Sequence, residues 1–105
     1  MTIREFEQLQ SENPAFMLYF HNDTCGVCKF LYPKVENLLN DKFPNIKLIR
    51  VSAQESRELA GQLRMLSVPG ILLFLEGKEF LRSNGMVSID QMESQIRRPY
   101  TLMFD

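Results

Sequence analysis

Residues 15–43 read AFMLYFHNDTCGVCKFLYPKVENLLNDKF, and this run predicts a buried strand, a close cysteine pair and a long helix in that order. The apolar residues Ala15–Phe20 follow one another without a polar break, which is typical of a strand buried on both faces. From Val27 to Phe43 apolar residues recur every three or four positions, so we expect an amphipathic helix that contains Pro33. Its expected buried positions are Val27, Phe30, Leu31, Val35, Leu38, Leu39 and Phe43.

Capping signals predict two shorter helices. Thr2-Ile3-Arg4-Glu5 supplies the hydroxyl and carboxylate of a capping box, so a helix should begin there and end before Asn13-Pro14. Ser52-Ala53-Gln54-Glu55 shows the same pattern and is expected to open another helix. The positions that this helix should bury are Leu59, Ala60 and Leu63.

The remaining elements are three strands and a last helix. The strands are expected at Ile46–Val51, Ile71–Leu75 and Glu79–Ser83. Glu76-Gly77-Lys78 forms a tight turn between the last two strands. Ser88-Ile89-Asp90-Gln91 caps the final helix, which we expect to run through Arg97 and to end at Pro99.

This order of elements predicts an α/β fold in one uninterrupted domain. Strands separated by helices pair in parallel through crossovers, whereas the short turn at Gly77 imposes one antiparallel pair. Helices must cover both faces of such a sheet, because each face is apolar.

Length and charge exclude several classes of function. The chain has 105 residues, enough for one core, and a formal net charge of -1, so nucleic acid is not an expected partner. The longest apolar runs, Phe16–Phe20 and Ile71–Leu75, are far shorter than the ~20 residues that span a bilayer. The first residues lack the apolar stretch of a secretory signal. With Met1 as the start, we expect a soluble cytoplasmic protein without a membrane partner.

Cys25 and Cys28 are the chain's two cysteines. If Cys28 lies in the first turn of a helix and Cys25 at its edge, the two sulfurs converge, and the positive end of the helix stabilises a Cys25 thiolate. This arrangement predicts thiol–disulfide exchange, in which Cys25 forms a mixed disulfide and Cys28 resolves it. Gly26 would let the backbone turn tightly and would leave room for a substrate.

Two other interpretations of the cysteine pair remain open at this point. A pair with this spacing can form half of a zinc site, but tetrahedral zinc needs four ligands and His21 is the sole histidine. We therefore expect no metal within one chain, although a site shared between two copies is harder to exclude. The cysteines could also be buried and inert.

Two segments of the chain resemble the thioredoxin family. Asp23–Lys29, followed by Pro33, is similar to the active-site segment of thioredoxin. Ser67–Phe74 is similar to the cis-proline loop of that family and to the strand after it. Gly77 and Gly85 lie at the distances from that proline at which the family has glycines. The resemblance covers about residues 2–98.

The resemblance implies a thioredoxin-like fold that lacks the family's first strand, with a four-stranded mixed sheet flanked by helices on both faces. It implies that Cys25 is the nucleophile and Cys28 the resolving thiol, that their disulfide serves without another cofactor, and that Val68–Pro69 is a cis peptide. The Val68 backbone would then pair with an extended substrate strand. Gly26, Val27, Val68 and Pro69 are the expected substrate-binding residues. The implied partners are disulfide-containing proteins and a thioredoxin-reductase-like electron donor.

The chain departs from the family next to the cysteines. Thr24 stands where thioredoxin has a tryptophan, and Val27 replaces a proline. Tyr19 falls at the position of a buried aspartate that is thought to move the proton of the resolving thiol. A phenol of pKa ~10 is a poor base at pH 7. We interpret Tyr19 as a core residue with a satisfied hydroxyl, with slow resolution as a consequence.

Other residues have alternative interpretations. His21 could assist the Cys25 thiolate or be a solvated bystander, and Arg50 could tune the thiols or reach solvent. Without the first strand of the family fold, the sheet edge along Ile46–Val51 lies uncovered. Residues 1–98 are expected to form the thioredoxin-like domain, and the apolar tail 99–105 to pack back on it. The edge or the tail could also form a homodimer.

Together these observations predict a small thiol–disulfide oxidoreductase that reduces protein disulfides. The alternative is a redox-inactive or redox-sensing binding module with the same fold. The residues between the cysteines do not fix the redox potential.

Overall fold

The computed structural model describes residues 1–105 and contains a single sheet with four strands. The elements in chain order are α1 (Ile3–Glu12), β1 (Ala15–His21), α2 (Gly26–Lys42), β2 (Lys47–Ser52), α3 (Arg57–Gln62), β3 (Gly70–Leu75), β4 (Lys78–Asn84) and α4 (Ile89–Phe104). The strand order is β2-β1-β3-β4, so β2 lies at an edge, as expected. β1 and β2 are parallel, while β3 is antiparallel to both β1 and β4. The sheet is therefore mixed.

The antiparallel pairing of β3 with β1 corrects the expectation that all strands separated by helices run in parallel. Gly70 pairs with Phe20, at the end of the sheet where β1 and β2 leave it. A parallel β3 would have to start about 20 Å away, at the other end of a six-residue strand. Helix α3 is six residues long and rises about 9 Å, so it does not carry the chain back.

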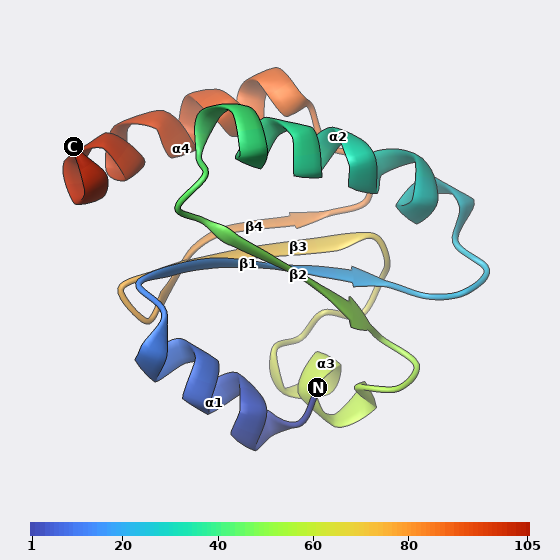
Figure 1. The fold of residues 1–105 in the computed structure, drawn as a ribbon. Coiled ribbons are helices and arrows are strands. Elements are labelled where there is room, and N and C mark those ends of the chain that lie inside the picture. The colour runs from blue at the N-terminus through green and yellow to red at the C-terminus, as the bar shows by residue number, and fades with distance from the viewer.

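Helices cover both faces of the sheet: α2 and α4 lie on one face, and α1 and α3 on the other (Figure 1). The side chains of β1 alternate between the two cores. Met17 and Tyr19 point toward α2 and α4, whereas Phe16, Leu18 and Phe20 point toward α1 and α3. All five are fully buried, which explains the unbroken apolar run in this strand.

The predicted caps at Thr2 and Ser88 are confirmed. The Thr2 hydroxyl accepts a hydrogen bond from the Glu5 amide at 3.0 Å, and the Glu5 carboxylate accepts one from the Thr2 amide at 2.8 Å. The Ser88 hydroxyl accepts from the Gln91 amide at 3.2 Å. The predicted helix start at Ser52 is wrong, because Ser52 still pairs with His21 in the sheet and α3 begins only at Arg57.

The expectation that Val27, Phe30 and Leu63 are buried is also corrected. Val27 and Phe30 are 43% and 60% exposed, because Cys28 occupies the buried face of α2 and each residue turns the helix by about 100°. Leu63 follows α3 as its C-cap and is half-buried.

Helix α4 does not end at Pro99 but continues to Phe104. The Tyr100 ring packs edge-on against Phe43 at 5.0 Å between ring centroids, and its hydroxyl accepts a hydrogen bond from the Asn45 amide at 3.0 Å. This packing outweighs the one helical hydrogen bond that a proline removes. The end of the chain thus packs back on the domain, and the expected boundary at residues 98 and 99 falls inside a helix.

Candidate active site

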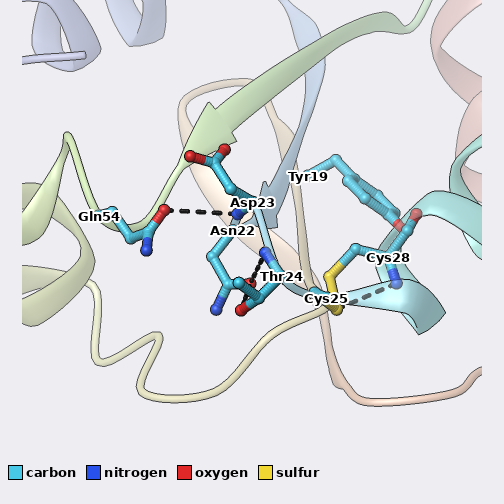
Figure 2. Close-up of a disulfide and its surroundings, with 7 residues drawn as sticks. All are labelled: Tyr19, Asn22, Asp23, Thr24, Cys25, Cys28 and Gln54. Carbon is cyan, nitrogen blue, oxygen red and sulfur yellow. Dashed lines mark hydrogen bonds between the residues drawn. A yellow bond between two sulfur atoms is a disulfide. The ribbon is translucent and has the colours of Figure 1, made fainter.

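A tight turn connects β1 to α2 and brings Cys25 to the start of that helix. The Asn22 side chain accepts hydrogen bonds from the Thr24 amide at 3.1 Å and from the Thr24 hydroxyl at 3.3 Å (Figure 2). The Asp23 amide donates to the Gln54 side chain at 3.4 Å. An asparagine side chain that bonds the backbone two residues on mimics a turn, so the chain reverses within a few residues.

The two cysteines form a disulfide with their Cα atoms 5.2 Å apart. Cys25 is the N-cap of α2, and its Sγ accepts a hydrogen bond from the Cys28 amide at 3.0 Å (Figure 2). Cys25 is half-buried, whereas Cys28 is only 2% exposed. The geometry therefore makes Cys25 the sulfur that a second molecule can reach, and Cys28 the one held behind it.

Gly26 and Val27 lie between the cysteines in the first turn of α2. Gly26 is exposed in ordinary helical backbone, and a Cβ atom there would meet no atom within 4 Å. A tight turn therefore does not require a glycine at this position, and a larger side chain there would have room. The exposed Val27 side chain adds an apolar surface next to the disulfide.

Tyr19 is fully buried, and its hydroxyl donates a hydrogen bond to the Cys28 carbonyl oxygen at 2.7 Å. Its ring packs edge-on against Tyr32, with 5.1 Å between centroids. Burial raises the pKa of Tyr19 to about 12, and the charge of Arg50 opposes this rise only in part. The interpretation of Tyr19 as a core residue with a satisfied hydroxyl is confirmed, and the phenol stays protonated at neutral pH.

The Val68–Pro69 peptide bond is cis. Because Gly70 pairs with Phe20, this peptide lies at the end of the sheet from which β1 leads to Cys25. Pro69 is buried, and its carbonyl oxygen accepts a hydrogen bond from the Gly85 amide at 2.7 Å. Val68 is half-buried and contacts both cores.

His21 and Arg50 line one cleft of about 250 Å³ that also reaches Cys28. The other lining residues are Asn22, Asp23 and Lys29. The Arg50 guanidinium lies 4.5 Å from the Tyr32 ring centroid, in a cation–π contact, so it is anchored beside the cleft. Both residues thus lie on the Cys28 side of the site. Tyr32 belongs to this site through its contacts with Arg50 and Tyr19, and its position one helical turn after Cys28 is the feature of the sequence that indicates it.

No three histidine, cysteine, aspartate or glutamate side chains gather closely enough to hold a metal ion. No helix has the length and apolar character needed to cross a bilayer.

An accessible cysteine at a helix N-terminus, disulfide-bonded to a buried cysteine in the first turn of the same helix, defines a thiol–disulfide oxidoreductase. The sequence model of the thioredoxin family matches residues 1–98, and the chain belongs to that family. The thioredoxin-like protein YdfQ of Bacillus subtilis is 39% identical over 96 residues, which are 91% of this chain and 85% of that protein. The thioredoxin of Chlamydia trachomatis is 33% identical over 76 residues, 72% of this chain and 74% of that protein.

Solved structures show the same fold. A mutant thioredoxin from Halobacterium salinarum superposes with a TM-score of 0.80 at 26% identity, covering 93% of this chain and 84% of that one. Oxidised mitochondrial thioredoxin 3 from Saccharomyces cerevisiae gives a TM-score of 0.81 at 22% identity, covering 91% of this chain and 89% of that one.

Proposed function

We propose that this chain reduces disulfides in proteins, with Cys25 as the attacking thiolate and Cys28 as the resolving thiol. The observation that carries this assignment is the asymmetry of the pair: Cys25 is accessible at the N-cap of α2, while Cys28 is 2% exposed. The Cys28 amide that donates to the Cys25 Sγ would stabilise a thiolate at the same place.

The reaction transfers two electrons from the dithiol to the substrate. The Cys25 thiolate attacks one sulfur of a substrate disulfide, forms a mixed disulfide and releases the other substrate cysteine as a thiolate. Cys28 then loses its proton and attacks the Cys25 sulfur. This step forms the Cys25–Cys28 disulfide and releases the second substrate cysteine. A dithiol donor of the thioredoxin-reductase kind would reduce the disulfide again.

The substrate surface in this proposal surrounds Cys25. Gly26 leaves the approach to the sulfur open, and Val27 offers exposed apolar area. The backbone of Val68, next to the cis peptide, would pair with an extended substrate strand, as in other peptide-binding modes that extend a sheet. The cytoplasm is the compartment we propose, since thiols stay reduced there. Pairing of two copies through the β2 edge or the end of α4 remains a prediction.

Reduction of insulin by dithiothreitol, with and without the chain, tests this function. Insulin reduction should accelerate with the unmodified chain and not with Cys25→Ser. Cys28→Ser should accumulate a mixed disulfide that gel electrophoresis without reductant separates. Failure of the unmodified chain to accelerate the reaction would contradict protein-disulfide reduction and would favour a binding module.

A further inference from the structure

The segment 63–69 between α3 and β3 carries the cis peptide and forms no helix or strand. Leu66, in its middle, is 85% exposed, so side-chain burial does not hold that part of the segment in place. Arg64 has a backbone φ of +56°, a conformation that residues with a side chain seldom adopt. Such a conformation persists only when surrounding contacts fix it.

Arg82 of β4 supplies two of those contacts. Its Nη2 atom donates a hydrogen bond to the Leu63 carbonyl oxygen at 2.8 Å, and its Nη1 atom donates to the Arg64 carbonyl oxygen at 3.2 Å. These carbonyl groups lie just after α3, where no further helical amide is present to donate a hydrogen bond to them. The planar guanidinium can bond both because its donors point in fixed, divergent directions.

Glu79 holds the guanidinium from the other side. Its two carboxylate oxygens accept hydrogen bonds from the Arg82 Nε atom at 3.0 Å and from the Nη2 atom at 2.8 Å. These bonds lower the pKa of the Glu79 carboxyl. Arg82 therefore keeps one orientation, with its remaining donors directed at the segment.

Strand β4 and the residue that follows it also form hydrogen bonds with the C-terminal end of the segment. The Gly85 amide, just beyond β4, donates to the Pro69 carbonyl oxygen at 2.7 Å, and the Ser67 hydroxyl donates to the Asn84 side chain at 3.4 Å. The Met65 side chain fills the space where a Cβ of Gly70 would lie. The segment is thus held at two places, at residues 63 and 64 by Arg82 and at residues 67–70, where Val68 lies between Ser67 and Pro69.

We propose that Arg82, braced by Glu79, is a positioning residue for protein-disulfide exchange: it fixes the segment 63–69 so that the Val68 backbone is ready to receive an extended substrate strand. This inference rests on the proposed function. A segment that is already ordered loses little conformational freedom when a substrate strand pairs with it, so the benefit appears in substrate binding. The sulfur chemistry at Cys25 does not depend on it.

A matched control exists on α4. Arg97 donates to Glu93 at 2.8 Å, in an exposed ion pair that makes no bond to the segment. Exposed ion pairs contribute little by themselves. Arg82→Gln and Arg97→Gln therefore each remove one positive charge and one arginine–glutamate ion pair. Only Arg82→Gln also removes the hydrogen bonds to Leu63 and Arg64.

Two measurements test the proposal. In dithiothreitol-coupled assays, Arg82→Gln should raise KM for insulin about fivefold, the equivalent of one lost hydrogen bond, and leave kcat nearly unchanged. Its rate with cystamine, a disulfide too small to pair as a strand, should match that of the unmodified chain. Amide hydrogen exchange of residues 64–70 should accelerate in Arg82→Gln and not in Arg97→Gln.

An equal loss with insulin and cystamine, an unchanged KM for insulin, or unchanged amide exchange would each overturn the proposal. If Arg82→Gln does not fold, Arg82→Lys is used, because it keeps the charge but cannot bond both carbonyls and Glu79 together. If the unmodified chain fails to reduce insulin, the proposed function falls. Arg82 is then tested by the exchange rate between the oxidised chain and a reduced cysteine-containing peptide, because strand pairing serves either direction.

Discussion

The Tyr19 hydroxyl lies 2.7 Å from the carbonyl oxygen of Cys28 and donates a hydrogen bond to it. This bond ties the centre of β1 to the first turn of α2, and so to the backbone of the buried cysteine. The hydroxyl keeps its proton at neutral pH, because the pKa of Tyr19 is raised to about 12. Tyr19 therefore holds the Cys28 backbone in place and does not act as a base.

Replacing Tyr19 by phenylalanine should lower the free energy of unfolding by about 1 kcal/mol, since it removes one buried hydrogen bond and keeps the ring. Urea unfolding of the disulfide form measures this change. Tyr32→Phe is the control: Tyr32 is half-buried and its hydroxyl donates no hydrogen bond to the protein, so its loss should cost less than about 0.5 kcal/mol. Equal effects of the two substitutions would contradict this role for Tyr19.

Tyr19 should also make the chain less stable at high pH. Its pKa in the folded state, about 12, lies above the ordinary value of 10.0, because burial disfavours the phenolate. In the unfolded chain the phenol loses its proton first, so its contribution to stability is complete below pH 10 and is lost as the pH rises toward about 12. The stability advantage of the unmodified chain over Tyr19→Phe should therefore shrink over that range and then reverse, because each pH unit between the two pKa values removes about 1.4 kcal/mol, more than the hydrogen bond contributes. A stability difference that stays constant from pH 10 to about 12 would contradict this effect of the Tyr19 phenol.

A carboxylate at position 19 should accelerate the resolving step. When the reduced chain is mixed with an aromatic disulfide, a first thiol is released by Cys25 attack and a second by Cys28 resolution. Tyr19→Asp should speed the second release by about tenfold or more, because a nearby base can take the Cys28 proton. Tyr19→Asn leaves the same cavity without a base and should not. Similar rates in the two variants would show that proton removal does not limit resolution.

Tyr100 should be a main anchor of the last turns of α4. It is 8% exposed and packs on Phe43, and its ring also contacts the Phe104 ring, with 4.8 Å between the two centroids. Tyr100→Ala should lower the free energy of unfolding by about 3 kcal/mol, as expected for loss of a buried aromatic ring. Leu102→Ala, at a residue that is 74% exposed, should change it by less than about 0.5 kcal/mol. Thermal or urea unfolding of the two variants measures this difference, and equal losses of stability would contradict the role of Tyr100.

The sequence by itself determined the features that depend on neighbouring residues. The caps at Thr2 and Ser88, the turn at Gly77 and the strand at Ala15–Phe20 follow from short-range hydrogen bonding and from unbroken burial. The spacing of Cys25 and Cys28 likewise implied their chemistry, because one helical turn brings the two sulfurs together.

Only the tertiary structure decided the features that depend on distant parts of the chain. Gly70 pairs with Phe20, and this pairing sets the direction of β3. Packing on Phe43 carries α4 past Pro99, although local propensity alone would end it there. Arg82 reaches carbonyls that lie 18 and 19 residues earlier in the chain. Local patterns do not specify such contacts, because the sheet must form before these groups come within hydrogen-bonding distance.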